Sequence, residues 1–335
     1  MKNTKKALTV LLIMVLLVSM VACGTSNQPN DAITTTTAVA AATTASQAET
    51  TTTSASGTAP SDNVVVGMII SDLTNEFFVT MVDGAKAKAA EFGIEIVAMD
   101  SGNNASKEMT NMEDMISQKP AVIAYNPVDS DAAVSAVELA NNAGIPLLTV
   151  DRSTNGGDII CHIASDNVYG GRIAGQHIVD KLGAAGGKVV EIQGQPGNSA
   201  ANDRGQGFHE AVDGAANIDV VLSQTGNWDK VEAMSIMENA LTANPDIKAV
   251  FCHNDVMALG AMEACINQGR NDVIIVGFDA DPTAVAAIEA GTMEATVQQL
   301  PALMGSLSIE IAYKQVNGES YENNIGAEVS LITKQ

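Results

Sequence analysis

Short apolar runs alternate with amphipathic segments from residue 64 to the end of the chain. The runs read VVVGMII, IEIVAMD, AVIAYNP, IPLLTVD, DIICHIASD, KVVEIQG, IDVVLSQTG, KAVFCHND, VIIVGFD and EATVQQLP. Because most of them contain a continuous apolar stretch, they predict strands that are buried on both faces, as in a parallel sheet covered by helices. We therefore expect an α/β fold.

Helices are expected between these runs, where apolar residues recur at helical spacing. Their ranges are 76–92, 105–118, 130–143, 167–182, 200–214, 228–243, 255–268, 282–290 and 301–317, followed by a closing strand near 325–333. The alternation restarts after the helix at 167–182. Two doubly wound lobes fit this number of strands better than one oversized sheet.

Polar residues follow several of the apolar runs. Asp151 and Arg152 come after IPLLTV, Asn126 follows AVIAY, Asn254 follows KAVFCH, and Asp279 follows VIIVGF. In open α/β sheets, ligands bind beyond the carboxyl ends of the strands. These side chains are therefore predicted to converge on one site for a small polar molecule.

The N-terminal segment has the composition of a secretory signal over residues 1–22. Lys2, Lys5 and Lys6 precede the apolar run ALTVLLIMVLLV. The following SMVACG resembles the lipobox of bacterial lipoproteins, whose cysteine is acylated, although Met stands where that motif favours Leu. Cys23 is thus the expected lipidation site, and an ordinary signal peptide is the alternative. Several acyl chains would hold the protein durably on the outer face of the cytoplasmic membrane.

A tether is expected at residues 23–62, because Thr, Ala and Ser dominate this stretch and large apolar side chains are scarce. Such a composition buries too little surface to offset the entropy of ordering. A flexible linker of this kind would let the folded part stand away from the membrane.

Net charge and the remaining cysteines exclude several classes of function. A formal charge of −22 disfavours nucleic acid as a partner, because phosphate contacts require clustered Lys and Arg. The irregular spacing of Cys161, Cys252 and Cys265 favours small buried residues over disulfides or a redox pair. His162 and His253 lie beside cysteines without further ligands at metal spacing. We expect no metal and no cofactor.

Several motifs together resemble the ribose-binding proteins of bacterial ABC sugar transporters. They are SDLTNEFFVTMVDGA, NPVDSDA, TVDR, HIASDNVYGGRIAG, SAANDRGQGF, NDVMALGA, VGFD and ATVQQLP, in this order along the chain. The resemblance covers residues 63–335. It implies a type I periplasmic-binding-protein fold, in which two lobes close on a monosaccharide and hand it to a membrane permease.

The resemblance also implies how the chain divides between the lobes. Three hinge crossings are expected, near 165–166, 299–300 and 327–328. The N-terminal lobe would then comprise residues 63–165 and 300–327, and the C-terminal lobe residues 166–299 and 328–335. In this arrangement the last helix returns to the first lobe.

The residues that would contact the sugar follow from the same motifs. In the first lobe the resemblance implies Asn75, Phe77, Phe78, Asn126, Asp151 and Arg152. In the second lobe it implies Arg204, Asn254, Phe278 and Asp279, and at a crossing Gln299. Trp228 stands where the ribose binders have phenylalanine, so the choice of sugar stays open.

The chemistry of these residues agrees with a neutral sugar. Its hydroxyls both donate and accept hydrogen bonds, and its C–H faces are apolar, so it suits carboxylates, guanidinium groups and amides between aromatic rings. Aromatic residues make up only 3% of the chain, yet Phe77, Phe78, Trp228 and Phe278 fall at the predicted site. For any one of them taken alone, core packing is the stronger alternative.

The sequence therefore predicts an exported, lipid-anchored and monomeric solute-binding protein of an ABC importer, which binds D-ribose and is not an enzyme. Alternatives are a hexose such as allose or galactose, presentation of a bound sugar to a sensory receptor, or a sugar-modifying enzyme. In the last case Asp151 and Asp279 would be a glycosidase pair. Neighbouring guanidinium groups are expected to hold both carboxylates ionised, which favours hydrogen-bond acceptance over proton donation.

Overall fold

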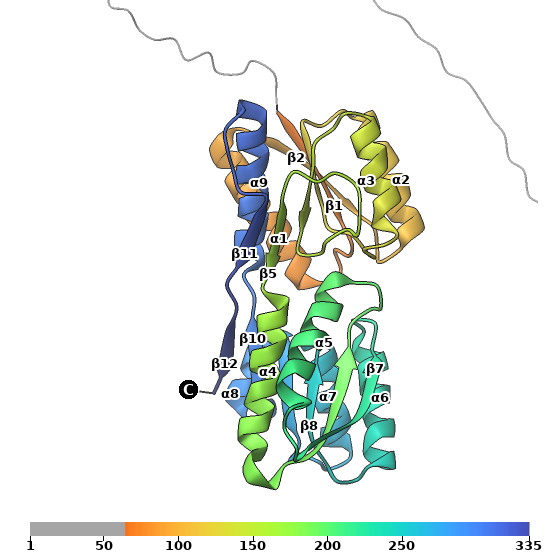
Figure 1. Cartoon of the computed structure of the whole chain (residues 1–335), viewed down its shortest axis with the longest axis vertical. Helices are drawn as coiled ribbons and strands as arrows, with labels where there is room; N and C mark the ends of the chain where they lie inside the picture. Colours follow the sequence, from red (N-terminus) through yellow and green to blue (C-terminus); the bar gives the residue numbers. More distant parts are fainter. Residues whose placement is uncertain (1–63, 335) are drawn as a thin grey trace, which may run out of the picture. The chain divides into compact units, whose positions relative to one another are not determined.

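The computed structural model describes residues 64–334. The expected signal sequence, the lipidation site Cys23 and the tether at 23–62 lie outside the described residues. Within them, the strands form two six-stranded sheets, each associated with its own helices (Figure 1). In this part of the chain, no helix combines the length and apolarity needed to cross a membrane.

The first sheet has the strand order β11-β5-β4-β3-β1-β2, and all its neighbouring strands are parallel. Its strands are β1 (Val65–Ile70), β2 (Glu95–Asp100), β3 (Val122–Tyr125), β4 (Leu147–Val150), β5 (His162–Ser165) and β11 (Asn324–Ala327). Its helices are α1 (Glu76–Phe92), α2 (Ala105–Ser117), α3 (Ala133–Asn142) and α9 (Pro301–Asn317). We call this sheet with its helices the first lobe.

The second sheet has the order β12-β10-β9-β8-β6-β7, in which only the β10–β12 pair is antiparallel. Its strands are β6 (Gly187–Gln193), β7 (Ile218–Thr225), β8 (Ile247–Cys252), β9 (Ile274–Asp279), β10 (Ala295–Gln298) and β12 (Ser330–Thr333). Its helices are α4 (Asn167–Leu182), α5 (Ser199–Val212), α6 (Lys230–Ala243), α7 (Asp255–Asn267) and α8 (Pro282–Ala290). This is the second lobe, and the predicted fold of two parallel-sheet lobes is confirmed.

The central strands of each sheet are buried on both faces, which explains their continuous apolar runs, whereas the strands β2 and β7 at the sheet edges are partly exposed. On β1, Met68 and Ile70 belong to the core under α1 and α9, whereas Ile69 belongs to the core under α2 and α3. On β6, Ile192 packs with α6 and α7, and Val189 packs with α4 and α5. Successive side chains of a strand point to opposite faces, so strands covered on both sides lack polar alternation.

The chain passes between the two sheets three times: between β5 and α4, between β10 and α9, and between β11 and β12. The single closing strand expected near 325–333 is corrected here. It forms two strands, β11 beside β5 and β12 beside β10, with Glu328 and Val329 between them. An extended run of residues looks the same in sequence whether it stays in one sheet or leaves it for another.

The cysteines of the described residues are buried and free. Burial raises the pKa of the Cys161 thiol to about 11 and that of Cys265 to about 12. Burial also raises the pKa of Cys252. These thiols therefore remain protonated at neutral pH and act as small apolar residues.

Candidate functional site

A polar cavity of about 300 Å³, including space open to solvent, lies where strand ends and helix starts of both lobes meet. Its lining residues are Asn75, Phe77, Phe78, Asp151, Arg152, Ala200, Arg204, Trp228, Asn254, Asp279 and Gln299. All the residues predicted to contact the sugar except Asn126 and Phe278 are among them. Ala200 was not predicted.

Most of the lining residues occupy positions where strands give way to helices or turns, whereas Arg204 lies within α5. Asp151 directly follows β4, and Gln299 directly follows β10. Asn75 and Asn254 are the N-caps of α1 and α7, where their side-chain oxygens accept backbone N–H groups of the first turn. Capping fixes these two amides, so each is held at the cavity by the start of its own helix.

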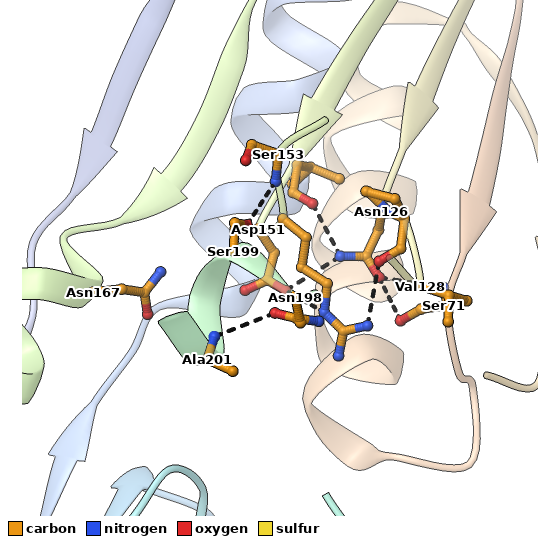
Figure 2. A network of polar contacts seen from close by, with 12 residues as sticks. Ser71, Asn126, Val128, Asp151, Ser153, Asn167, Asn198, Ser199 and Ala201 are labelled. Atoms are coloured by element: carbon orange, nitrogen blue, oxygen red, sulfur yellow. Dashed lines mark hydrogen bonds and ion pairs between the residues drawn. The ribbon is translucent and has the colours of Figure 1, made fainter. Parts of the chain in front are cut away.

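The carboxylate of Asp151 is positioned from behind by Asn126, as Figure 2 shows. Asn126 Nδ2 donates to Asp151 Oδ2 at 3.2 Å and to the carbonyl oxygen of Val150 at 3.0 Å. Its Oδ1 accepts from the hydroxyl of Ser71 at 2.7 Å, which fixes the orientation of the amide. Asn126 is fully buried and therefore lies one layer behind the cavity.

Arg204 is held by a network of polar contacts in the second lobe. Its Nε donates to Asn167 Oδ1 at 2.9 Å, and its Nη1 donates to the carbonyl oxygen of His253 at 2.6 Å. The Asp279 carboxylate lies 3.6 Å from Nη1 and itself accepts from Gln299 Nε2 at 2.6 Å. This network leaves the guanidinium plane with one orientation.

Aromatic rings cover the two guanidinium groups. The Arg204 guanidinium carbon lies 3.8 Å from the ring centre of Phe278 and 5.7 Å from that of Trp228. The Arg152 guanidinium carbon lies 5.1 Å from the ring centre of Phe78. These distances allow cation–π attraction. Phe278 is fully buried beneath Arg204, which is why it does not line the cavity.

Backbone strain is concentrated at the same place. Asp151, Trp228 and Asp279 have φ angles of 65°, 63° and 121°, in a region that residues with a Cβ rarely adopt. Each such residue costs on the order of 1–3 kcal/mol, and such strain clusters at functional sites. The fold therefore holds three lining residues in conformations that they would not adopt freely.

Four buried atoms of the lining residues have no hydrogen-bond partner. Two are acceptors, Asp151 Oδ1 and Gln299 Oε1, and two are donors, Arg152 Nε and Trp228 Nε1. Buried polar groups of folded proteins are nearly always paired. A ligand with several hydroxyls could pair with both kinds of atom, since each hydroxyl donates and accepts.

Burial has the largest effect on the pKa values of the acidic and basic side chains that line the cavity. It raises the pKa of Asp151 and of Asp279, and the nearby guanidinium groups lower these pKa values by less. The expectation that the guanidinium neighbours decide the ionisation of both carboxylates is corrected, because desolvation is the larger effect. Burial also lowers the pKa of Arg152 and Arg204.

Two hydrogen bonds join the lobes beside the cavity. The backbone N–H of Ser153 donates to Ser199 Oγ at 2.9 Å (Figure 2), and that of Ser130 donates to the carbonyl oxygen of Gly197 at 3.1 Å. Ser153 and Ser130 belong to the first lobe, and Ser199 begins α5 of the second. The lobes are therefore in contact along the cavity.

Sequence reasoning missed Ala200 and Asn167. Ala200 lies in the first turn of α5, where the motif SAANDRGQGF begins, and its small side chain carries no polar signal. Asn167 follows the predicted strand DIICHIASD and orients Arg204. Its polar side chain at a strand-to-helix junction was a usable signal of the same kind as Asn126.

Two α/β lobes with a buried polar cavity at their strand ends define a two-lobed small-molecule-binding protein. The chain belongs to the family described as periplasmic binding protein domain, which matches residues 66–320.

Within this family, the chain is similar to ribose import binding proteins in sequence and to an ABC transporter solute binding protein in fold. The chain is 43% identical to the ribose import binding protein RbsB of Escherichia coli (strain K12), over 81% of this chain and 90% of the relative. It is 40% identical to RbsB of Bacillus subtilis (strain 168), over 84% and 90%. Its fold is similar to an ABC transporter solute binding protein from Bacillus halodurans C-125 with bound myo-inositol, with a TM-score of 0.76, 32% identity and coverage of 81% and 94%.

Proposed function

We propose that this chain is an exported solute-binding protein that holds D-ribose between its two lobes and delivers it to an ABC permease. The observation that carries the proposal is the set of four buried atoms of the lining residues that have no hydrogen-bond partner, two donors and two acceptors. A polyhydroxyl ligand satisfies such a set. The relatives support the ligand class, because they are named as binding proteins for ribose import or carry a bound polyol.

Ribose is proposed over a six-carbon sugar on two grounds. The ribose import proteins are 40–43% identical to this chain. The cavity wall includes Trp228, whose indole takes up more room than phenylalanine and adds an N–H donor. The added bulk should disfavour a ring that carries an exocyclic CH₂OH group and favour a compact pentose.

A sugar panel tests this choice on the wild type and on Trp228→Phe. Thermal-shift screening of pentoses, hexoses and myo-inositol, followed by calorimetry, should place ribose first in both proteins. Hexose binding should improve in the variant. A wild-type preference for glucose, galactose or allose would contradict the ribose assignment. Recovery of a chemically altered sugar would contradict a binding role.

We further propose that Cys23 carries a lipid anchor, on the basis of the apolar run and small residues that precede it. In cells given radiolabelled fatty acid, the wild type should take up label and sediment with membranes, and Cys23→Ser should do neither. Ser26→Ala, a matched change close by, should behave as the wild type. An unlabelled, soluble wild-type protein would contradict the anchor.

A further inference from the structure

A buried acid and imidazole lie behind the second-lobe wall of the cavity. Glu191 of β6 is completely buried, and His253, which follows β8, is 1% exposed. Glu191 Oε1 lies 3.0 Å from His253 Nε2, and neither residue lines the cavity. Burying such a pair carries a desolvation cost that apolar side chains would avoid. Packing of the core therefore gives no reason for its presence.

The contacts of His253 fix its tautomer. The backbone N–H of Gly194 lies 3.2 Å from His253 Nδ1. A backbone N–H can only donate, so Nδ1 must accept and the ring proton must sit on Nε2, where it is donated to Glu191. The imidazole is therefore neutral in this arrangement. A proton added at Nδ1 would remove the hydrogen bond to Gly194.

Gly194 supports the indole of Trp228. A Cβ at Gly194 would lie 2.1 Å from Cζ2 and Cη2 of Trp228, so the indole rests directly on this backbone. The hydroxyl of Thr225 donates to the carbonyl oxygen of Gly194 at 2.8 Å and fixes the other side of the residue. A shift of Gly194 would therefore move the indole.

His253 also holds Arg204 through its own backbone. Its carbonyl oxygen accepts from Arg204 Nη1 at 2.6 Å, and the next residue, Asn254, lines the cavity. The Glu191–His253 pair thus connects to three lining residues, Trp228 through Gly194, Arg204 through the carbonyl group, and Asn254 through the chain.

We propose that Glu191 and His253 are positioning residues that hold the indole of Trp228 in place for the sugar, and that they do so while His253 is neutral. This inference rests on the proposed sugar-binding function. Acidification should release Gly194, loosen the indole and weaken sugar binding.

Ionisable groups on two elements face His253. Glu191 lies on β6, and Arg204 and His209 lie on α5. Burial lowers the pKa of His253, the Glu191 carboxylate raises it by less, and Arg204 and His209 lower it further. Glu191 also accepts from His209 Nε2 at 3.2 Å and from Gln193 Nε2 at 2.9 Å. His253 should therefore take up its proton at a lower pH than an ordinary histidine does.

Trp228 is the only tryptophan of the chain, so its fluorescence reports the proposed movement directly. Its emission is measured without sugar from about pH 8 to about pH 5, across the range in which histidines titrate. The wild type should show a change on the acid side of this range. His253→Gln should lose most of it, because a glutamine amide can accept from Gly194 and donate to Glu191 at every pH. His177→Gln is the matched control, since His177 of α4 contacts Glu294 away from the cavity, and it should keep the change.

Binding of D-ribose provides the second measurement. His253→Leu should weaken it about threefold to tenfold at neutral pH, as expected for loss of one hydrogen bond. His253→Gln should restore most of the loss. In the wild type, affinity should fall as the emission changes, and in His253→Gln it should depend less on pH.

The outcomes separate this inference from the ribose assignment. If the wild type does not bind D-ribose but the emission change is present and depends on His253, the ribose assignment fails and the positioning role stands. If His253→Gln keeps the full emission change, or His253→Leu keeps wild-type emission and affinity, the positioning role is wrong. If His253→Leu does not fold, the positioning role is still tested by comparing the pH dependence of emission in the wild type and in His253→Gln.

Discussion

At the scale of single residues, the cavity depends on side chains whose hydrogen bonds leave one atom free for a ligand. Asp151 is the clearest case. Its Oδ2 accepts from Asn126, and its Oδ1 has no partner in the protein. A ligand hydroxyl that donates to Oδ1 would give both oxygens of Asp151 a hydrogen-bond partner.

We therefore expect Asp151→Ala to weaken sugar binding by about tenfold to a hundredfold, because a buried ligand hydroxyl that loses its hydrogen-bond partner costs about 1–3 kcal/mol. Arg204→Ala should have an effect of the same size. Calorimetry with D-ribose measures both. Asp158→Ala, an exposed acid on the same lobe, is the control and should bind as the wild type. An Asp151→Ala protein with wild-type affinity would remove Asp151 from the site.

A buried acid also makes stability depend on pH. Asp255 begins α7 and accepts from the Thr296 hydroxyl at 2.7 Å and from the Asp281 backbone N–H at 2.8 Å. Burial raises its pKa from 3.8 to about 8. The folded state therefore binds this proton more tightly than the unfolded chain does. Its stabilising contribution is present at low pH and is lost as pH rises from about 4 to about 8.

From this group we expect the free energy of unfolding to fall by about 2 kcal/mol between about pH 6 and about pH 8. Asp255→Asn should have a flatter pH profile in urea unfolding, because the asparagine does not titrate. Asp219→Asn, at an exposed position of the same lobe, should keep the wild-type slope. An unchanged slope in Asp255→Asn would show that other groups set the pH dependence.

At the scale of elements, close helix pairs set the position of the cavity residues. Helices α4 and α5 meet at glycines: a Cβ at Gly171 would lie 2.1 Å from the carbonyl oxygen of Arg204, and one at Gly207 would lie 1.9 Å from that of Val168. Backbone atoms cannot give way as the end of a flexible side chain can. The approach of α4 to α5 therefore places Arg204.

Gly207→Ala should lower the free energy of unfolding by about 1–3 kcal/mol, the usual cost of overpacking a tight contact. Gly214→Ala is a matched control near the end of the same helix, because a Cβ there meets no atom within 4 Å. Denaturant unfolding of both variants makes the comparison. Equal stability would mean that α4 and α5 can separate at little cost.

Much of the fold and of the candidate site could be predicted at this scale. Apolar runs marked the strands because both sheets are covered on both faces. The motifs indicated which residues gather at the cavity, but not which of them line it and which lie buried behind its wall. Asn126 and Phe278 lie one layer behind it, since depth depends on how Asp151 and Arg204 pack against them. The change of sheet between β11 and β12 left no signal in the local pattern.

At the scale of the whole described region, the candidate site belongs to neither lobe alone. Asp151 and Arg152 come from the first lobe, and Trp228 comes from the second. Each of the three offers a buried atom that has no hydrogen-bond partner. A ligand that pairs with all of them makes more contacts when the lobes are together. Such differential binding is what shifts a two-state equilibrium towards closure.

The radius of gyration should therefore decrease when a bound sugar joins the lobes. Small-angle scattering on a version beginning at Asn63 compares the free protein with the protein saturated with D-ribose. Asp151→Ala should need about tenfold to a hundredfold more sugar for the same decrease, because it loses a first-lobe contact while the second lobe is unchanged. A sugar that calorimetry shows not to bind is the control and should leave the curve unchanged. If a sugar that binds tightly also leaves the curve unchanged, closure is not how this protein holds its ligand, and the lobes are already together before it arrives.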